Sequence, residues 1–125
     1  MAGSCTVTAK LTPTPIKKIS FDWLSDASGN VSGGDAVTTF SVTGKIISAS
    51  FIPDAGGTQP TNAYDVTVLD ADGVDVLAGA GADLSNAAQV LKNTTQLGAV
   101  VESTLSLNVA NAGNAKGGIV TLFLQ

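Results

Sequence analysis

The sequence has no histidine, no arginine and only one cysteine among its 125 residues. Histidine is the commonest general base and metal ligand in proteins, so its absence removes the Ser–His and Cys–His pairs on which most nucleophilic catalysis depends. The single thiol, Cys5, has no partner for a disulfide within the chain and no identifiable group to activate it. These absences argue against an enzyme, and we expect neither a catalytic residue nor a cofactor.

The chain is also poor in aromatic residues, with four Phe, one Trp and one Tyr. Two carboxylates are enough for glycoside hydrolysis, and aspartates are plentiful, but binding clefts are lined largely by apolar and aromatic side chains. Most of the aromatic residues here fall at positions that belong to a core. The composition therefore also argues against a carbohydrate-cleaving enzyme.

Charged residues make up only 13% of the chain, against about 25% in a typical soluble domain. Six lysines are outnumbered by nine aspartates and one glutamate, which gives a net charge of -4. Recognition of nucleic-acid phosphates requires clustered positive charge, and Lys17 and Lys18 form the only adjacent basic pair. We expect no nucleic-acid partner, and we interpret this pair as a solvated strand edge.

Long hydrophobic runs are missing as well. No segment approaches the roughly 18 consecutive apolar residues of a membrane helix, and Ala2 in place of Gly removes the usual start for myristoylation. We expect no membrane partner, and synthesis in a cytoplasm. The mean hydropathy of +0.32 indicates that other protein covers part of the surface. The alternative is a monomer with a threonine-rich β surface.

What the sequence does contain is alternation of apolar and polar residues, the pattern of half-buried β-strands. The expected strands are 5–11, 19–23, 37–43, 45–52, 64–68, 74–76, 103–109 and 119–124. Segments rich in Gly, Pro, Asn and Asp join them, among them the loops 25–35 and 53–61. About eight short strands predict an all-β fold, an antiparallel β-sandwich with a jelly roll as one candidate topology, in a single domain over residues 1–125.

Two segments depart from this pattern. Pro13 and Pro15 close the first strand, so residues 1–14 are expected to form an extended N-terminal arm or an edge strand. Between residues 84 and 91 the apolar side chains follow a helical spacing, which predicts one short helix there.

Some strands carry apolar residues on both faces, as the expected strands 45–52 and 119–124 do. Such strands lie centrally in a sheet or at a contact between subunits. Trp23, on the second strand, we assign to the core. The candidate interface residues are Val7, Leu11, Ile46, Ile52, Val120, Leu122 and Leu124.

The sharpest local pattern is a β-hairpin over residues 62–79. Tyr64, Val66 and Val68 alternate with polar residues, the tetrapeptide DADG supplies a turn, and alternation then resumes.

This hairpin also holds the densest cluster of carboxylates, formed by Asp70, Asp72 and Asp75. Carboxylates around a glycine-bent loop are a feature of calcium sites, but the spacing of an EF-hand is not met. We interpret the cluster as a type I turn in which Asp accepts backbone N–H bonds and Gly73 ends the turn. A weak metal site is the alternative.

Three segments give the chain a resemblance to a known group of proteins. They are ISFDWLSDASGNVSG, NAYDVTVLDADGVDVLAGAGADLSN and STLSLNVANAGNAKGGIVTLFLQ. They resemble small virion structural proteins of tailed bacteriophages, in which a YDVT-x-x-D-x-x-G-x-DVL hairpin and a NAG-x-A-K-x-G turn before the last strand recur. The similarity covers residues 19 to 125.

The resemblance implies a non-enzymatic virion protein of the capsid cement or decoration type, made in the bacterial host cytoplasm. Such a protein binds the outer capsid surface and stabilises the lattice of the major capsid protein. Its implied partners are that protein and further copies of itself, as a homodimer or homotrimer. Two alternatives stay open: a receptor- or glycan-binding module of a head or tail fibre, which would use the loops 25–35 and 53–61, and another tail or connector component.

Overall fold

The computed structural model describes residues 3–10, 16–32, 37–38, 42–93, 97 and 99–125. Its elements are β1 (Ser4–Lys10), β2 (Lys17–Leu24), β3 (Val42–Pro53), a 3-10 turn (Gly56–Thr58), β4 (Asp65–Leu69), β5 (Val90–Lys92), β6 (Val100–Ser103), β7 (Ser106–Ala110) and β8 (Gly117–Leu124). The short 3-10 turn is the one helical element within these ranges. The fold is therefore all-β, as the alternation predicts.

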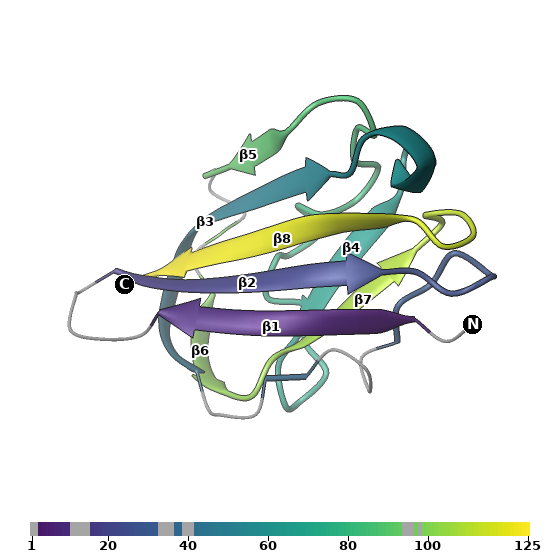
Figure 1. Ribbon diagram of the computed structural model, residues 1–125. Helices are drawn as coiled ribbons and strands as arrows, with labels where there is room; N and C mark the ends of the chain where they lie inside the picture. The colour runs from purple at the N-terminus through teal and green to yellow at the C-terminus, as the bar shows by residue number, and fades with distance from the viewer. Residues whose placement is uncertain (1–2, 11–15, 33–36, 39–41, 94–96, 98) are drawn as a thin grey trace.

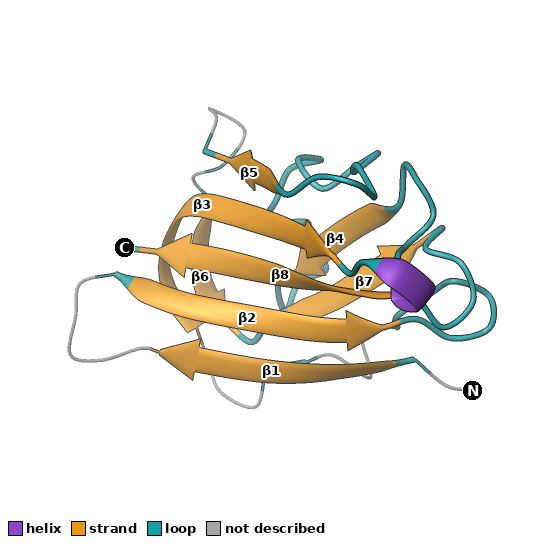
Figure 2. Cartoon of the chain, turned by 45° about the horizontal axis from the view of Figure 1, so that its top comes forward, coloured by secondary structure: helices purple, strands orange, loops and turns teal. Residues whose placement is uncertain are grey.

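The strands form two sheets, and all pairings between strands are antiparallel. The larger sheet has the order β1-β2-β8-β3-β5, with β6 paired to the first part of β3, and the smaller sheet pairs β4 with β7. Figures 1 and 2 show the smaller sheet packed behind the larger one. The chain is thus an antiparallel β-sandwich.

The pairings follow a jelly roll, in which a ribbon of antiparallel strand pairs is wound into two facing sheets. In the larger sheet the pairs are β2 with β8 and β3 with β5. In the smaller sheet, isolated bridges add Val31 and Val37 beside β7, and Leu84 beside Tyr64 at the start of β4. These two pairs in each sheet are the four strand pairs of a jelly roll. The topology that the sequence left open is therefore a jelly roll.

Alternate side chains from both sheets fill the core. The buried residues include Ile19, Phe21 and Trp23 of β2, Val120, Leu122 and Leu124 of β8, Val66 and Val68 of β4, and Leu107 and Val109 of β7. Trp23 is only 2% exposed, which confirms its assignment to the core. The central position predicted for the last strand is also confirmed, because β8 lies between β2 and β3.

The helix expected near residues 84–91 is absent, and this prediction was wrong. The backbone of Leu84 instead pairs with Tyr64, donating to its carbonyl at 2.8 Å, and residues 90–92 form β5. Between them the Ser85 hydroxyl accepts the N–H groups of Ala87 and Ala88, both at 3.2 Å. Such local side-chain bonds compete with a helical turn, and the segment is too short for propensity to override pairing.

The expected separation of strands 37–43 and 45–52 is wrong as well, because β3 runs without interruption from Val42 through Gly44 to Pro53. Gly44 has a φ of +148°, and a Cβ there would lie 3.1 Å from the Gln125 carbonyl oxygen. Glycine serves here for a close approach inside a strand. Of the expected strand 37–43, Val37 forms a single bridge to Ser106, and residues 39–41 lie outside the described ranges.

The hairpin over residues 62–79 is only partly as expected. Its first arm is β4, but the second arm is reduced to one bridge between Leu69 and Asp75. Val74, which alternation placed inward, is 57% exposed. The main partner of β4 is β7.

The predicted edge strand is present, since β1 forms one margin of the larger sheet. Its seven residues pair in unbroken register with β2. Residues 1–2 and 11–14 of the expected arm, Leu11 among them, lie outside the described residues. Within the part of the chain that is described, no helix is long and apolar enough to cross a membrane.

Candidate interaction surface

The outward side of the larger sheet, which we call the outer face, presents short and mostly uncharged side chains. Strand register aligns them in rows across the sheet. One row is Thr6, Asp22, Ile119 and Ile52; the next is Thr8, Ser20, Thr121, Ser50 and Leu91; the third is Lys10, Lys18, Phe123 and Ser48. The middle row contains no charge at all.

Hydroxyl groups bond to each other in that middle row. The Ser20 and Thr121 oxygens are 3.2 Å apart across the β2–β8 pair. Cross-strand hydroxyl pairs of this kind stabilise a sheet and leave no strongly solvated group on its surface. A neutral face of this type loses little solvation free energy when another protein covers it.

Apolar side chains lie on both sides of the middle row and at its β5 end. Ile52, Ile119 and Phe123 are half-buried, and Leu91 on β5 is 64% exposed. Contiguous apolar side chains on an exposed sheet mark contact sites more often than isolated ones do. The outer face is thus the best candidate for an interaction surface.

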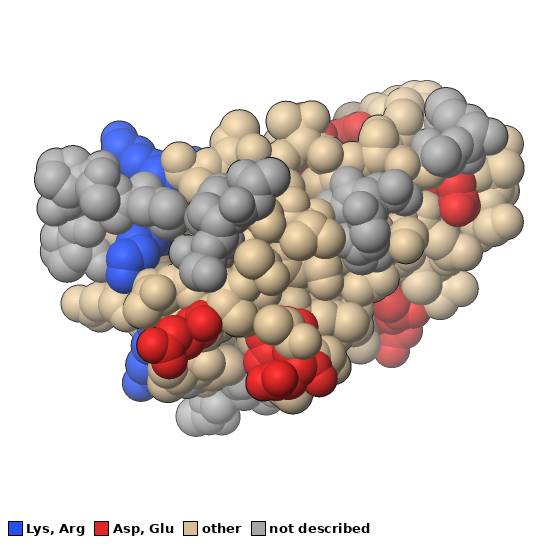
Figure 3. Space-filling model, turned by 90° about the horizontal axis from the view of Figure 1, so that it is seen from below, with Lys and Arg blue, Asp and Glu red and all other residues tan. Residues whose placement is uncertain are grey.

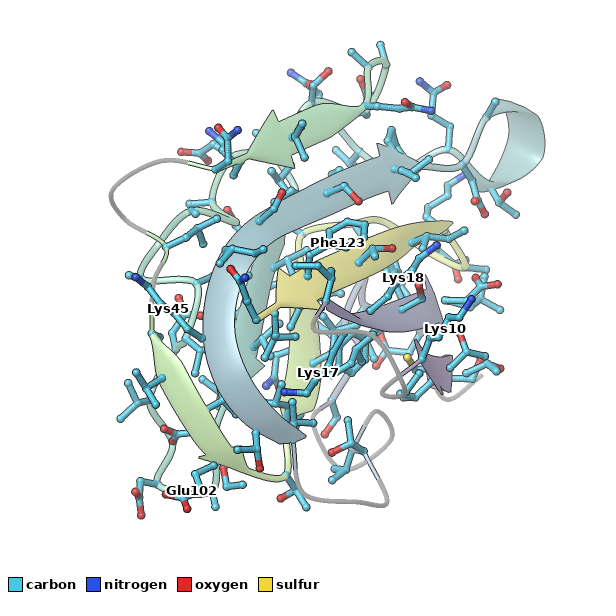
Figure 4. The ribbon with its side chains drawn as sticks, turned by 90° about the vertical axis from the view of Figure 1, so that its left-hand side faces the viewer. Lys10, Lys17, Lys18, Lys45, Glu102 and Phe123 are labelled. Atoms are coloured by element: carbon cyan, nitrogen blue, oxygen red, sulfur yellow. The ribbon has the colours of Figure 1, made fainter. Side chains whose placement is uncertain are left out.

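Lysines gather where this face ends. Lys10 and Lys18 lie opposite each other on β1 and β2, Lys17 is opposite Leu124, and Lys45 exchanges backbone hydrogen bonds of 2.9 Å with Gln125. Figure 4 shows all four at this end of the sandwich, near Phe123, and Figure 3 shows Lys gathered toward one end while Asp and Glu are spread more widely.

The basic end includes an open hollow of about 230 Å³ lined by Thr8, Ala9, Lys10, Lys18 and Ser20. Like charges directly opposite each other on paired strands are unfavourable, so Lys10 and Lys18 would gain from an acidic neighbour. Lys17 is already engaged, because its ammonium donates to the Thr43 carbonyl at 2.8 Å.

The two long loops predicted from the sequence meet at the opposite end. Ala112, in the turn before β8, donates its N–H to the Gly29 carbonyl and accepts the N–H of Thr61. The Ser25 hydroxyl donates to the Gly113 carbonyl and accepts the Lys116 N–H at 2.9 Å. The described parts of 25–35 and 53–61 are thus held side by side by the 111–116 turn.

Acidic groups at this loop end are bound to local donors. The Asp26 carboxylate accepts the N–H groups of Ser28 and Asn30, and these bonds lower the pKa of its carboxyl, with the Asn30 bond contributing most. Asp65 accepts an amide N–H of Asn111 at 2.7 Å. These carboxylates stabilise turns.

The carboxylate cluster at residues 70–75 forms the turn that the sequence predicts. Asp70 accepts the N–H groups of Asp72 and Val74 through one oxygen, and Gly73, at φ +82°, donates to the Asp70 carbonyl. Asp75 accepts three further backbone N–H groups, from Val68, Leu77 and Gly79. No group of three metal-ligating residues occurs among the described residues.

Cys5 lies on the inward side of β1, half-buried beside Trp23. Burial, and to a lesser degree the charge of Asp22, raises the pKa of its thiol to about 11. A thiol of this kind is mostly protonated at neutral pH and is a poor nucleophile.

Four of the seven candidate interface residues belong to the core, and their assignment was wrong. Ile46, Val120, Leu122 and Leu124 are at most 1% exposed, so no other molecule can contact them. Their strands are covered on the inner side by the smaller sheet. Ile52 lies half-buried on the outer face, Val7 is half-buried on β1, and Leu11 is outside the described residues.

Besides Ile52, the structure exposes apolar residues that were not among the candidates from the sequence. Ile119 and Phe123 form one of the two apolar faces of β8, and alternation alone does not say which face points outward. Leu91 and Val100, 64% and 78% exposed, lie on strands of three and four residues, too short for a periodic signal.

Comparison with known proteins gives distant likenesses of fold. No family model and no curated protein matches the sequence. A cupin domain from Bordetella pertussis Tohama I shares 10% identity over 100% of this chain and 97% of its own, with a TM-score of 0.36. An RmlC-like cupin protein from Desulfovibrio desulfuricans shares 12% identity over 95% of this chain and 81% of its own, with a TM-score of 0.33. Likenesses at this level assign no function.

Proposed function

We propose that this chain is a non-enzymatic structural protein of a tailed-bacteriophage virion, a cement or decoration protein. It binds the outer surface of the capsid and stabilises the lattice of the major capsid protein. The observation that carries the proposal is the outer face, a broad sheet surface of hydroxyl and aliphatic side chains whose middle row is uncharged.

Such a face suits permanent contact with another protein. Covering the middle row costs little, because Thr121 is already only 5% exposed and its hydroxyl bonds to that of Ser20. Half-buried Ile52, Ile119 and Phe123 supply the apolar area. Each contact need not be strong, since many copies held on one lattice act together.

The remaining polar groups support a structural role. The carboxylates that cluster in the sequence accept backbone N–H groups in turns, and the thiol is half-buried with a raised pKa. With no histidine in the chain, the candidate site is a surface and not a catalytic cleft.

Purified phage particles from a strain carrying the gene test the proposal. A cement protein is expected in a fixed ratio to the major capsid protein, and a cryo-EM map should place it on the outer capsid surface. Particles from a strain in which the gene is deleted should release their DNA at a lower temperature. Absence from the particles would refute the proposal, and density confined to the tail would replace it with the tail or connector role.

One observation favours a second candidate, a receptor- or glycan-binding module of a fibre. The hydrogen bonds around Ala112 hold two long loops together at one end of the sandwich, as in proteins that bind ligands with clustered loops. A glycan array separates the two functions: the module should bind a defined glycan, and the cement protein should bind none.

A further inference from the structure

The strand β1 forms one edge of the larger sheet. All seven residues pair with β2 without a bulge, and no other strand among the described residues pairs with the far side of β1. Five of its seven side chains are exposed. Natural proteins block such edges with proline, bulges or charges, because the unpaired N–H and C=O groups recruit further strands. β1 carries none of these devices except Lys10 at its end.

The sequence of β1 is nearly symmetrical about its central residue. Val7 is flanked by Thr6 and Thr8, and beyond them by the small residues Cys5 and Ala9. If a second copy pairs antiparallel with its centre at the same valine, Val faces Val, Thr faces Thr and small faces small. Pairs of threonines and of β-branched residues are favourable across antiparallel strands.

We propose that two copies of this chain associate through β1, antiparallel and centred on Val7, into a twofold dimer with one continuous sheet. Charge favours this direction. In the antiparallel pairing Lys10 faces Ser4 of the second copy, whereas a parallel pairing would place the two Lys10 side chains together. The half-buried side chains of Cys5 and Val7 would also lose exposed apolar surface at the contact.

The size of the edge sets the strength of the dimer. Seven residues per strand cover less than the roughly 800 Å² per partner of a stable interface, so we expect a weak, concentration-dependent dimer in solution. The twofold axis stands perpendicular to the sheet, so the outer faces of both copies point the same way. The dimer therefore presents two outer faces on the same side. This would add to the proposed function, but the dimer does not depend on that function.

Cysteine pairs test the register in a Cys5→Ser background. Thr6 of one copy should face Thr8 of the other at about 5 Å between Cα atoms, within reach of a disulfide. Mixing the Thr6→Cys and Thr8→Cys proteins under oxidation should give a cross-linked dimer. Each protein alone should not, because its two cysteines would be more than about 7 Å apart at Cα. Cross-linking of each alone at the rate of the mixture, or none in the mixture, overturns the register.

A matched pair of charge variants tests the dimer itself. Both carry Thr6→Lys, which lies beside Asp22 within the chain, and they differ in Thr8→Lys or Thr8→Glu. The Lys/Lys protein should sediment as a monomer at concentrations where the unsubstituted protein dimerises, because like charges face each other twice. The Lys/Glu protein should still dimerise. Circular dichroism confirms that both are folded.

The outcomes separate this inference from the proposed function. If the two charge variants and the unsubstituted protein all sediment alike, whether as monomers or as dimers, pairing through β1 is refuted. A dimer in solution that never joins phage particles refutes the cement function and leaves the dimer. The protein could also join particles and bind an extended segment of the capsid protein along β1. That result would show that the β1 edge pairs with the capsid protein and not with a second copy, and it would refute the dimer.

Discussion

The indole ring of Trp23 packs against the phenol ring of Tyr64, with 5.7 Å between ring centroids and 45° between ring planes. Trp23 lies on β2 of the larger sheet, and Tyr64 precedes β4 of the smaller one. Both rings are at most 2% exposed. A tilted aromatic pair of this kind adds to the apolar area that each ring buries. The pair therefore joins the two sheets of the sandwich.

Truncation of Trp23 should strongly lower the stability of the protein. Trp23→Ala is expected to lower the free energy of unfolding by about 3–5 kcal/mol. Trp23→Phe should cost clearly less, because the indole N–H has no hydrogen-bond partner in the structure and its removal breaks no bond. Urea denaturation monitored by far-UV circular dichroism measures the free energy of unfolding of both variants. Tryptophan fluorescence cannot be used, because both variants lack the only tryptophan. Equal losses would show that the indole N–H makes a bond that matters.

Two aspartates of the 70–75 turn, Asp72 and Asp75, should contribute very differently to the stability of the protein. The Asp75 carboxylate accepts N–H groups of Val68, Leu77 and Gly79. Asp75→Ala leaves these donors without their acceptor and should cost about 1–3 kcal/mol. Asp72→Ala is the matched control, because the Asp72 carboxylate makes no such bond to a described residue, and it should change stability by about 0.5 kcal/mol or less. A similar cost for both would contradict this role for Asp75.

Glycine at position 118 is expected to be required by packing. A Cβ there would lie 2.9 Å from the Ile52 carbonyl oxygen and 3.0 Å from Cζ2 of Trp23. Gly118→Ala should therefore lower the free energy of unfolding by about 1–3 kcal/mol. Gly57→Ala serves as control, since nothing lies within 4 Å of its Cβ position. Thermal unfolding of the two variants decides, and an unchanged Tm for Gly118→Ala would contradict the close approach.

Alternation identified the strands whose two faces differ. β1 and β2 have polar residues on one side, and the apolar side of β2 is the core, with Trp23 in it. The turn at Asp70 and Gly73 was also predictable, because its residue types satisfy a turn without help from the rest of the fold.

Where both faces are apolar, the sequence could not say which one is buried. In β8 the smaller sheet covers Val120 and Leu122, so Phe123 is left on the outer face. In β3 the register shifts between Ile46 and Ser48. A bulge of this kind reverses the faces of the residues on one side of it, which turned Ile46 from a candidate contact residue into a core residue.

Alkaline pH should destabilise the protein through two groups. Burial raises the pKa of the Cys5 thiol from 9.0 to about 11 and that of the Tyr64 hydroxyl from 10.0 to about 12. Between pH 9 and 11 the unfolded chain loses the thiol proton while the folded chain keeps it, so stability falls as the pH rises.

Cys5→Ser should make the pH dependence of the midpoint of urea unfolding flatter between pH 9 and 11. The Tyr64 contribution, which begins above pH 10, should remain in this variant and provides an internal control. An unchanged profile would mean that the thiol titrates alike in the folded and unfolded chains.

If the chain is the cement protein we propose, a charge on the outer face should abolish its binding to the capsid without unfolding the protein. Phe123 is half-buried on β8, beside Lys18 and Ser48, and its side chain does not reach the core. Phe123→Glu removes apolar contact area and places a carboxylate in the contact, and burying that carboxylate is costly even with Lys18 opposite it on β2. Val74→Glu is the matched control, because Val74 is 57% exposed in a turn away from this face.

Both proteins are added to particles that lack the native protein, and the bound fraction is measured after sedimentation. Phe123→Glu should lose most of its binding and Val74→Glu should keep it. The reverse result would move the contact from the outer face to the 70–75 turn.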